Sequence, residues 1–306
     1  MISIIKQRKI WLSLSTIMVI ASIIVFAMYG LKPGIDFTGG SSLEISFNIS
    51  RPTKDSLSET LAPLGLTNLI IQPVGDNGYN IRSKSIDEKT HQDVLAALNN
   101  KYKPADAAAD TKILEEKSFD SIGPTVGQEL RNKSIWAIIV VSFAIIAYIA
   151  FAFRKVSKPI ASWKYGIIAV ISLMHDIIIV VGAFALLGKF YGLEVNAPFI
   201  AALLTIFGYS NNDTIVVFDR IRENLKRRVG EDFDKVVDAS INEVIVRSIN
   251  TSFTVLLALF AIFVFGGKSI HDFTLALIIG VTIGTYSSIF LASPLLVVWE
   301  KLASKK

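Results

Sequence analysis

The sequence contains no cysteine among its 306 residues and only three histidines. Disulfides, thiolate metal sites and thiol chemistry are therefore excluded. Nor does the chain carry a basic stripe with interleaved aromatic residues, so its net charge of +5 gives no reason to expect a nucleic-acid partner. These absences direct attention to the residues that the chain holds in excess, which are apolar.

Apolar residues make up 52% of the sequence, and the mean hydropathy is +0.52. A helix needs about 20 apolar residues to cross a hydrocarbon core of about 30 Å. The first apolar run is too long for a signal peptide and lacks a clear cleavage site, so we expect it to be retained. We predict an α-helical membrane protein with six spans, at 10–31, 134–153, 165–187, 195–218, 244–265 and 273–299.

Basic residues predict the orientation, because Lys and Arg in short flanking segments stay on the cytoplasmic side. Clusters at 6–9, 154–158, 226–228 and 301–306 all fall on one side if both termini are cytoplasmic. The predicted domains are a cytoplasmic N-terminus at 1–9, the first transmembrane helix at 10–31, an external domain with a lead-in helix at 32–133, a five-helix bundle at 134–299 with a cytoplasmic loop at 219–243, and a cytoplasmic tail at 300–306.

The external segment has the pattern of a small α+β domain. Alternation and turn signals predict strands at 42–47, 68–72, 79–82 and 112–121, with helices at 52–64 and 85–98. This order matches a ferredoxin-like split unit. Ser85 and Glu88 fit a capping box, and Gly39 with Gly40 suits a tight turn into the first strand. With His91 as its one histidine and no paired acids, the domain is expected to bind rather than to catalyse.

Asp213 is the most unusual residue, because it stands inside an apolar run that is long enough to cross a bilayer. An ionised carboxylate there costs several kcal/mol unless it finds a partner, water or a proton. Helical phase places it on one face with other polar side chains, and two further runs carry polar faces. We expect these faces to meet in a buried polar seam. Its predicted members are Thr205, Tyr209, Asn212 and Asp213, then Arg247, Asn250 and Thr251, and finally Ser172, His175 and Asp176.

Two interpretations of this seam stay open. Asp213 could carry a proton while Arg247 approaches and departs, because Arg remains charged throughout. The pair could instead be static and fix the helix register, which adds little net stability. The neighbours His175 and Asp176 could take part in the relay or simply close a hydrogen-bond network. We do not expect a metal site there, since adjacent helical residues diverge by about 100 degrees and no second His is near.

Several motifs resemble the SecF branch of the SecD/SecF protein-export family, within the resistance-nodulation-division superfamily. The segments that carry the resemblance are 34–40 (GIDFTGG), 121–124 (SIGP), 208–224 (GYSNNDTIVVFDRIREN), 247–252 (RSINTS), 284–289 (GTYSSI) and 292–294 (ASP). The motif residues include Asp36, Gly39, Gly40, Gly123, Pro124, Asp219 and Arg220. Together they cover nearly the whole chain.

The resemblance implies a subunit without covalent chemistry of its own, in a bacterial cytoplasmic membrane, that pairs with SecD and works with SecYEG and SecA. It implies that proton flow moves external domains that touch an unfolded preprotein. The family's essential acid and arginine fall on Asp213 and Arg247, while Asn212, His175 and Asp176 occupy polar positions. Protons are the only coupling species that it implies, with no cofactor and no metal.

One position departs from the family pattern. Asn211 stands where an apolar residue is usual, and its phase predicts either a hydrogen bond between helices or a lipid-facing cost of roughly 1 kcal/mol. The alternatives to export are a proton-driven small-molecule or lipid exporter of the same superfamily and an intramembrane protease. A single small external domain argues against the exporter, because it is small for a substrate tunnel. The absence of the expected protease motifs argues against the intramembrane protease.

Overall fold

The computed structural model describes residues 3–66, 69–104, 113–152 and 162–304. It divides into two compact units, one of residues Pro33–Lys133 and one of Met1–Lys32 with Ser134–Lys306. Helix α5 (Pro124–Ala152) begins in the first unit and continues in the second. We describe each unit by itself.

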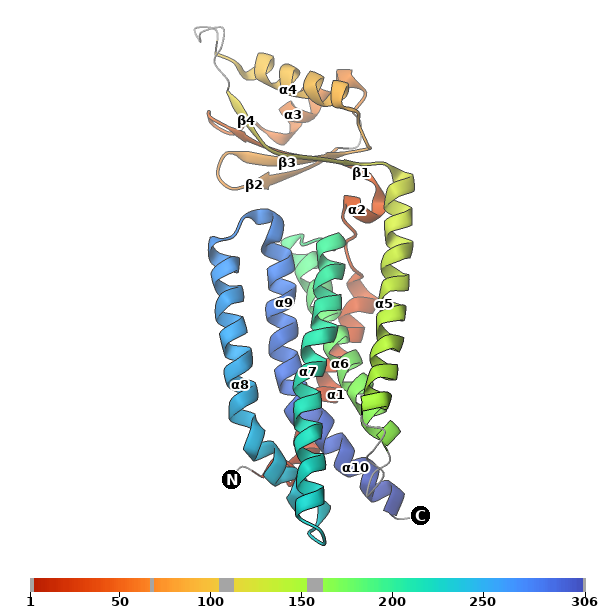
Figure 1. The fold of residues 1–306 in the computed structure, drawn as a ribbon. Helices are drawn as coiled ribbons and strands as arrows, with labels where there is room; N and C mark the ends of the chain where they lie inside the picture. Colours follow the sequence, from red (N-terminus) through yellow and green to blue (C-terminus); the bar gives the residue numbers. More distant parts are fainter. Residues whose placement is uncertain (1–2, 67–68, 105–112, 153–161, 305–306) are drawn as a thin grey trace. The chain divides into compact units, whose positions relative to one another are not determined.

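The smaller unit, residues 33–133, is a four-stranded antiparallel sheet with two helices on one face (Figure 1). The strands stand in the order β2-β3-β1-β4, and their elements follow the predicted alternation of strand and helix along the chain. Residues 68 and 112, which were expected at strand ends, lie outside the described part. The elements are α2 (Ile35–Thr38), β1 (Gly40–Phe47), α3 (Lys54–Leu61), η1 (Ala62–Leu64), β2 (Ile70–Val74), β3 (Gly78–Ser83), α4 (Glu88–Tyr102) and β4 (Leu114–Ile122).

Alternate residues of the strands form the core of this unit, as the period of two requires. Leu43, Ile45 and Phe47 of β1 are buried against α3 and α4. The predicted capping box at Ser85 is wrong. Asp87 caps α4 instead, accepting a hydrogen bond from the Thr90 backbone N–H at 3.0 Å, because the first helical residue is Glu88 and the cap must directly precede it.

The predicted tight turn at Gly39 and Gly40 is confirmed. Gly39 has φ +70°, and a Cβ there would lie 2.8 Å from Pro124 Cα; Gly40 has φ +128°, and its Cβ would lie 2.8 Å from the Ser83 carbonyl oxygen. Only glycine combines this backbone with such close contact. The pair therefore lets the corner between α2 and β1 pack directly on the first turn of α5, which begins at Pro124.

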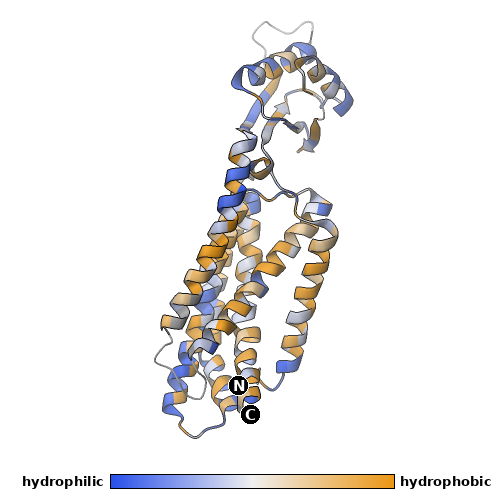
Figure 2. Cartoon of the chain, turned by 90° about the vertical axis from the view of Figure 1, so that its right-hand side faces the viewer, coloured by the Kyte–Doolittle hydropathy of each residue, from blue (hydrophilic) through white to orange (hydrophobic). Residues whose placement is uncertain are grey.

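The larger unit is a bundle of long helices, which are mostly apolar along their length (Figure 2). Besides the second part of α5, they are α1 (Arg8–Tyr29), α6 (Ser162–Tyr191), α7 (Ala197–Arg227), α8 (Phe233–Phe265), α9 (Lys268–Ser287), the π-helical segment η2 (Ser288–Ala292) and α10 (Ser293–Ser304). Four helices of the described residues are long and apolar enough to cross a membrane: Arg8–Tyr29, Trp163–Tyr191, Phe233–Phe265 and Ile270–Ala303. The last runs through α9, η2 and α10.

Residues 219–243, expected to form a loop, are instead a helical hairpin. Helix α7 continues to Arg227 and α8 begins at Phe233, with Asp232 as its N-cap. The apolar side chains of both extensions explain the difference, because Phe218, Ile221 and Val237 join one buried cluster.

Candidate functional site

The centre of the larger unit holds two buried carboxylates on neighbouring helices. Asp176 of α6 is fully buried, and Asp213 of α7 is 4% exposed. Burial of an ionised group away from water is costly unless other groups satisfy it. The polar neighbours of the two acids therefore decide what this site can do.

Asp176 has three close partners. Its Oδ2 accepts hydrogen bonds from the Ser210 hydroxyl at 2.5 Å and the Ser287 hydroxyl at 2.8 Å. Its Oδ1 lies 2.9 Å from His175 Nδ1. The predicted neighbour pair on α6 is thus in contact and is joined to α7 and α9. Ser172, which was expected to belong to this face, is buried, and its hydroxyl has no hydrogen bond among the described residues.

Asp213 has a single hydrogen-bond partner among the described residues. The Ser252 hydroxyl of α8 donates to its Oδ2 at 3.3 Å. The hydroxyls of Tyr209 and Thr285 lie 3.3 Å and 2.6 Å from Ser252 Oγ. A serine hydroxyl can accept two hydrogen bonds and donate one. Asp213 therefore lies at the end of a hydroxyl chain that joins α7, α8 and α9.

The two acid networks share helices α7 and α9. Ser210 and Asp213 lie one turn apart on α7, so their side chains are neighbours. A Cβ at Gly284 of α9 would lie 2.9 Å from Ser210 Cβ. The absence of a side chain at Gly284 thus lets α9 approach closely enough for Thr285 and Ser287 to reach the two networks.

Asp213 and Arg247, predicted to pair during part of a proton cycle, are not in contact among the described residues of this structure, so the pairing stays a prediction. Arg247 is exposed, and no described carboxylate lies within ion-pair distance of its guanidinium; its carbonyl oxygen accepts a bond from Thr251. The buried polar residues described on α8 are Ser240, Ser248 and Ser252 instead, and of these Ser252 reaches Asp213. Helical phase groups Arg247, Asn250 and Thr251 on one face of α8, but it does not show which face of α8 packs against α7.

Most of the other residues predicted for the seam lie outside the hydrogen-bond network. Thr205, Asn212, Asn250 and Thr251 are exposed, and Tyr209 is half-buried and joins it. Asn211, expected to point away, is buried, and its Oδ1 has no hydrogen bond among the described residues. The reason is that the buried stripe of α7 runs through Ser210, Asp213 and Thr214, and it includes Asn211 while leaving Asn212 exposed.

Sequence reasoning assigned no role to the hydroxyl residues that hold the acids. Ser210, Ser252, Thr285 and Ser287 stand in the quoted motifs, but nothing in a single sequence distinguishes them from packing residues. The spacing of Ser210 three residues before Asp213 was the one usable signal, because such residues are adjacent on a helix.

The motif residues Asp219 and Arg220 belong to a separate cluster at the α7–α8 hairpin. Arg220 contacts Glu243 and, at 2.6 Å, Glu223, while the Asn224 amide donates to Ser240 at 3.0 Å and Glu243 at 2.8 Å. Asp219 pairs with Arg222 at 3.5 Å. This network joins the ends of two helices, and none of its hydrogen bonds or ion pairs within the described residues involves Asp176 or Asp213.

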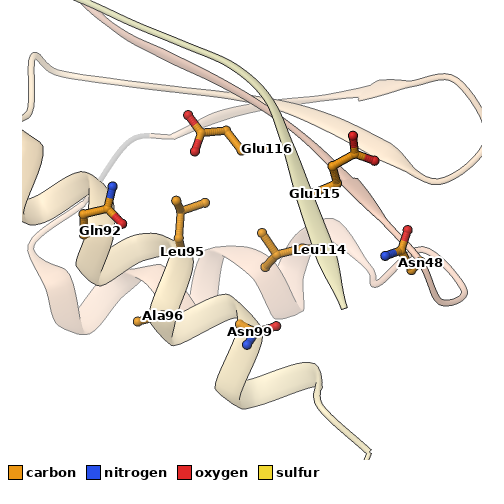
Figure 3. A pocket seen from close by; sticks show the side chains of 8 residues that line it. All are labelled: Asn48, Gln92, Leu95, Ala96, Asn99, Leu114, Glu115 and Glu116. Carbon is orange, nitrogen blue, oxygen red and sulfur yellow. The ribbon is translucent and has the colours of Figure 1, made fainter. Parts of the chain in front are cut away.

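The smaller unit carries a groove of about 650 Å³ between α4 and the start of β4 (Figure 3). Amide, carboxylate and aliphatic side chains line it, namely Asn48, Gln92, Leu95, Ala96, Asn99, Leu114, Glu115 and Glu116. Nearby, the buried His91 ring stacks on Phe119 with centroids 3.8 Å apart. Hydrogen bonds from Gln92 and His91 lower the pKa of Glu88.

Within the described residues, no three His, Asp or Glu side chains are grouped as a metal ion would require. The larger unit instead combines apolar spanning helices with carboxylates held by hydroxyls. These features define a helical membrane protein with an intramembrane polar network, and intramembrane acids of this kind mark ion or proton pathways.

Comparison with known proteins specifies the family. The sequence model described as "Protein export membrane protein SecD/SecF, C-terminal" matches residues 102–302, and the SecD/SecF GG motif matches residues 24–48, which include Gly39 and Gly40. The chain belongs to the SecD/SecF family of protein-export membrane proteins.

Its relatives include proteins named protein translocase subunit SecF. That of Thermobaculum terrenum is 44% identical over 98% of this chain and 94% of the relative. Those of Anaerolinea thermophila and Synechocystis are 38% and 36% identical with the same coverage. A crystal structure of SecDF, a translocon-associated membrane protein from Thermus thermophilus, matches with TM-score 0.80 and 30% identity, over 98% of this chain. This chain spans 39% of the length of that SecDF chain.

Proposed function

We propose that the chain is the SecF subunit of a protein translocase and acts with a SecD partner. In this proposal it uses the proton motive force to assist late, SecA- and SecYEG-dependent export of preproteins across the bacterial cytoplasmic membrane. Family membership, relatives named SecF over nearly the full length, and the buried acid network support it. The chain would perform no covalent chemistry of its own.

The proposal includes a topology of six spans with both termini cytoplasmic. α5 and α7 would supply the two spans beyond the four apolar ones, since α7 is long enough but carries the polar residues of the site. Residues 33–133 would be external and ferredoxin-like, which the strand order β2-β3-β1-β4 supports. The basic clusters flanking the helices would remain on the cytoplasmic side.

The observation that carries the proposal is that Asp213 is buried and that, in the described part of the chain, it has one hydroxyl partner and no cation beside it. The protonated form of the Asp213 side chain is favoured here over the ionised form, because an isolated buried charge costs several kcal/mol. Approach of Arg247 in another state of the cycle would favour the ionised form and release the proton. The Ser252 chain and the Asp176 network are the groups through which protons would move.

The exposed polar residues of α7 and α8 support a partner in the membrane. Arg247, Asn250 and Thr251 of α8 and Asn212 of α7 are exposed in the single chain. A charged side chain facing lipid costs about 2.5–3.5 kcal/mol at the helix centre on insertion scales. SecD helices covering this surface would remove that cost and would place Arg247 at the interface between the subunits.

In the external unit, the groove of Figure 3 is the surface that we propose for the preprotein. Its amide and carboxylate groups can hydrogen-bond an extended backbone, and Leu95 with Leu114 offers an apolar surface. An unfolded chain presents both kinds of group. The groove therefore fits sequence-tolerant contact better than recognition of one small molecule.

The test is export into vesicles with an imposed proton gradient. Asp213→Asn and Arg247→Met are each expected to abolish the stimulation of export by the gradient, while the variants remain folded and bound to SecD. Asp272→Asn is a matched control, because this α9 acid contacts His271 and lies outside both networks. Undiminished stimulation in both Asp213→Asn and Arg247→Met would reject the proton relay and leave a structural role.

A further inference from the structure

Two adjoining grooves run along the outside of the larger unit, between α1, α6 and the segment from η2 to α10. One, of about 440 Å³, lies beside Trp299 and Leu302. The other, of about 590 Å³, continues to His175 and Ile20. Both are lined by Ile171 and Leu295, so they form one continuous feature. We name it the α1–α6–α10 groove.

The groove walls are almost wholly aliphatic. Residues of four elements contribute, including Leu12 of α1, Ile168 of α6, Leu291 of η2 and Val298 of α10. All belong to helices that are apolar enough to cross a membrane. The groove therefore opens onto the acyl region of the bilayer. Among the few polar residues that line the groove, Ser15 and Thr16 already make hydrogen bonds inside the protein.

A cation lies at one end of the groove. The Lys164 ammonium is 5.9 Å from the ring centroids of both Trp163 and Trp299, and the two indoles are in T-shaped contact at 5.7 Å. Trp299 is also a wall of the groove. Tryptophan is enriched at the level of the lipid headgroups, so this end lies where phosphates are found.

Lys164 differs from the other cations near the same end of the bundle. Arg8 and Lys301 both contact Asp234, whereas no carboxylate of the described residues lies within 4 Å of the Lys164 ammonium. Its charge is thus available to an anion from outside the protein. Basic pockets between membrane helices are suited to anionic lipid headgroups.

We propose that the α1–α6–α10 groove binds an anionic phospholipid, with its phosphate at Lys164 and one acyl chain along Ile171 and Leu295 towards His175. The charge selects the headgroup, the indoles fix its depth, and the aliphatic walls hold the chain. A protein helix is a poorer occupant, because the polar residues that a partner would need to cover are on α7 and α8. The proposal is independent of proton coupling.

Retention of lipid by the purified full chain tests the proposal. The protein is equilibrated in nanodiscs of phosphatidylglycerol and phosphatidylcholine, and bound lipid is measured by native mass spectrometry. Wild type is expected to enrich phosphatidylglycerol about fivefold, from roughly one favourable charge contact. Lys164→Gln should remove this enrichment. Ile171→Trp, which fills the groove, should reduce retention of both lipids.

Lys189→Gln is the matched control, because Lys189 stands at the opposite end of α6 over the Tyr29 ring and lines neither groove. It should behave as wild type. Glycerol phosphate, added in excess, should not displace the lipid, since it lacks the acyl chain. Thermal unfolding confirms that each variant is folded.

A photoreactive residue at Ile171 identifies the occupant directly in the complex with SecD. An adduct with phospholipid supports the proposal, whereas an adduct with a protein overturns it. Equal enrichment in wild type and Lys164→Gln also overturns it, because the groove would then hold surrounding lipid without selecting the headgroup. Displacement of the lipid by glycerol phosphate would also overturn the proposal, because it would show that the acyl chain does not contribute to binding.

Discussion

Asp176 and Asp213 differ in the number of donors that hold them. Two serine hydroxyls and the His175 ring converge on Asp176, while Ser252 is the one hydrogen-bond partner of Asp213 among the residues that the structure describes. A group with several buried donors is fixed in place, and its loss leaves several polar atoms unsatisfied. A group with one donor can change partner more readily. The two acids therefore have different parts in the site, one positional and one mobile.

This difference predicts unequal effects on stability. Asp176→Asn presents an amide N–H₂ to existing donors, so we expect it to lower the free energy of unfolding by about 1–3 kcal/mol. Asp213→Asn should change it by less than about 1 kcal/mol. Thermal unfolding of the full chain in one detergent compares them. Equal destabilisation would contradict the distinction.

Gly39 offers a second prediction at the residue scale. Gly39→Ala combines a left-handed backbone with a contact of 2.8 Å to Pro124. Gly65 has a similar φ of +76°, yet a Cβ there would meet no atom within 4 Å. Gly65→Ala should cost about 1 kcal/mol from backbone strain, and Gly39→Ala at least about 1 kcal/mol more from overpacking. Hydrogen exchange of the β1 amides measures both; equal effects would show that the contact is unimportant.

Among the helices, α7 and α9 depend on closely packed glycines. A Cβ at Gly280 of α9 would lie 2.2 Å from Ile206 Cδ1 of α7, and one at Gly284 would lie 2.9 Å from Ser210 Cβ. Such a contact excludes even one methyl group unless a helix moves. The distance between α7 and α9 in turn sets the reach of Thr285 and Ser287 to the two networks.

Gly280→Ala is therefore expected to destabilise the bundle by about 1–3 kcal/mol through overpacking. Gly208→Ala is the control, because no atom would lie within 4 Å of a Cβ there, and alanine favours a helix over glycine by up to about 1 kcal/mol. The midpoint of thermal unfolding should fall for the first variant only. A fall in both would indicate a general effect of glycine replacement.

Element positions were largely predictable, and contacts between elements were not. The apolar runs at 165–187 and 244–265 lie inside α6 and α8, and the succession of strands and helices along the small unit followed from alternation and turns. The hydrogen-bond partner of Asp213 could not be predicted from the sequence, because helical phase shows which residues share a face but not which helix packs against that face. Arg247 and Ser252 stand on the same helix five residues apart, and only packing shows that Ser252 faces inward.

For the molecule as a whole, the exposed polar surface of α7 and α8 predicts the position of a partner. Asn250→Trp is expected to reduce recovery of coexpressed SecD severalfold, since a bulky side chain would separate the helices. Ile23→Trp, on the exposed surface of α1, should leave recovery unchanged. Copurification on a tagged chain measures both. A stable homotrimer instead of a pair with SecD would favour a small-molecule exporter.

The π-helical turn at Ser288–Ala292 follows directly after Ser287, the donor to Asp176. A π turn contains one residue more than the regular spacing needs, and one residue corresponds to about 100° of rotation about the axis. If the π turn shifted by one position along the helix, α10 would rotate about its axis while the packing of α9 on α7 stayed the same. In the proposed proton cycle, this turn would let α10 rotate relative to α9 next to the fully buried Asp176.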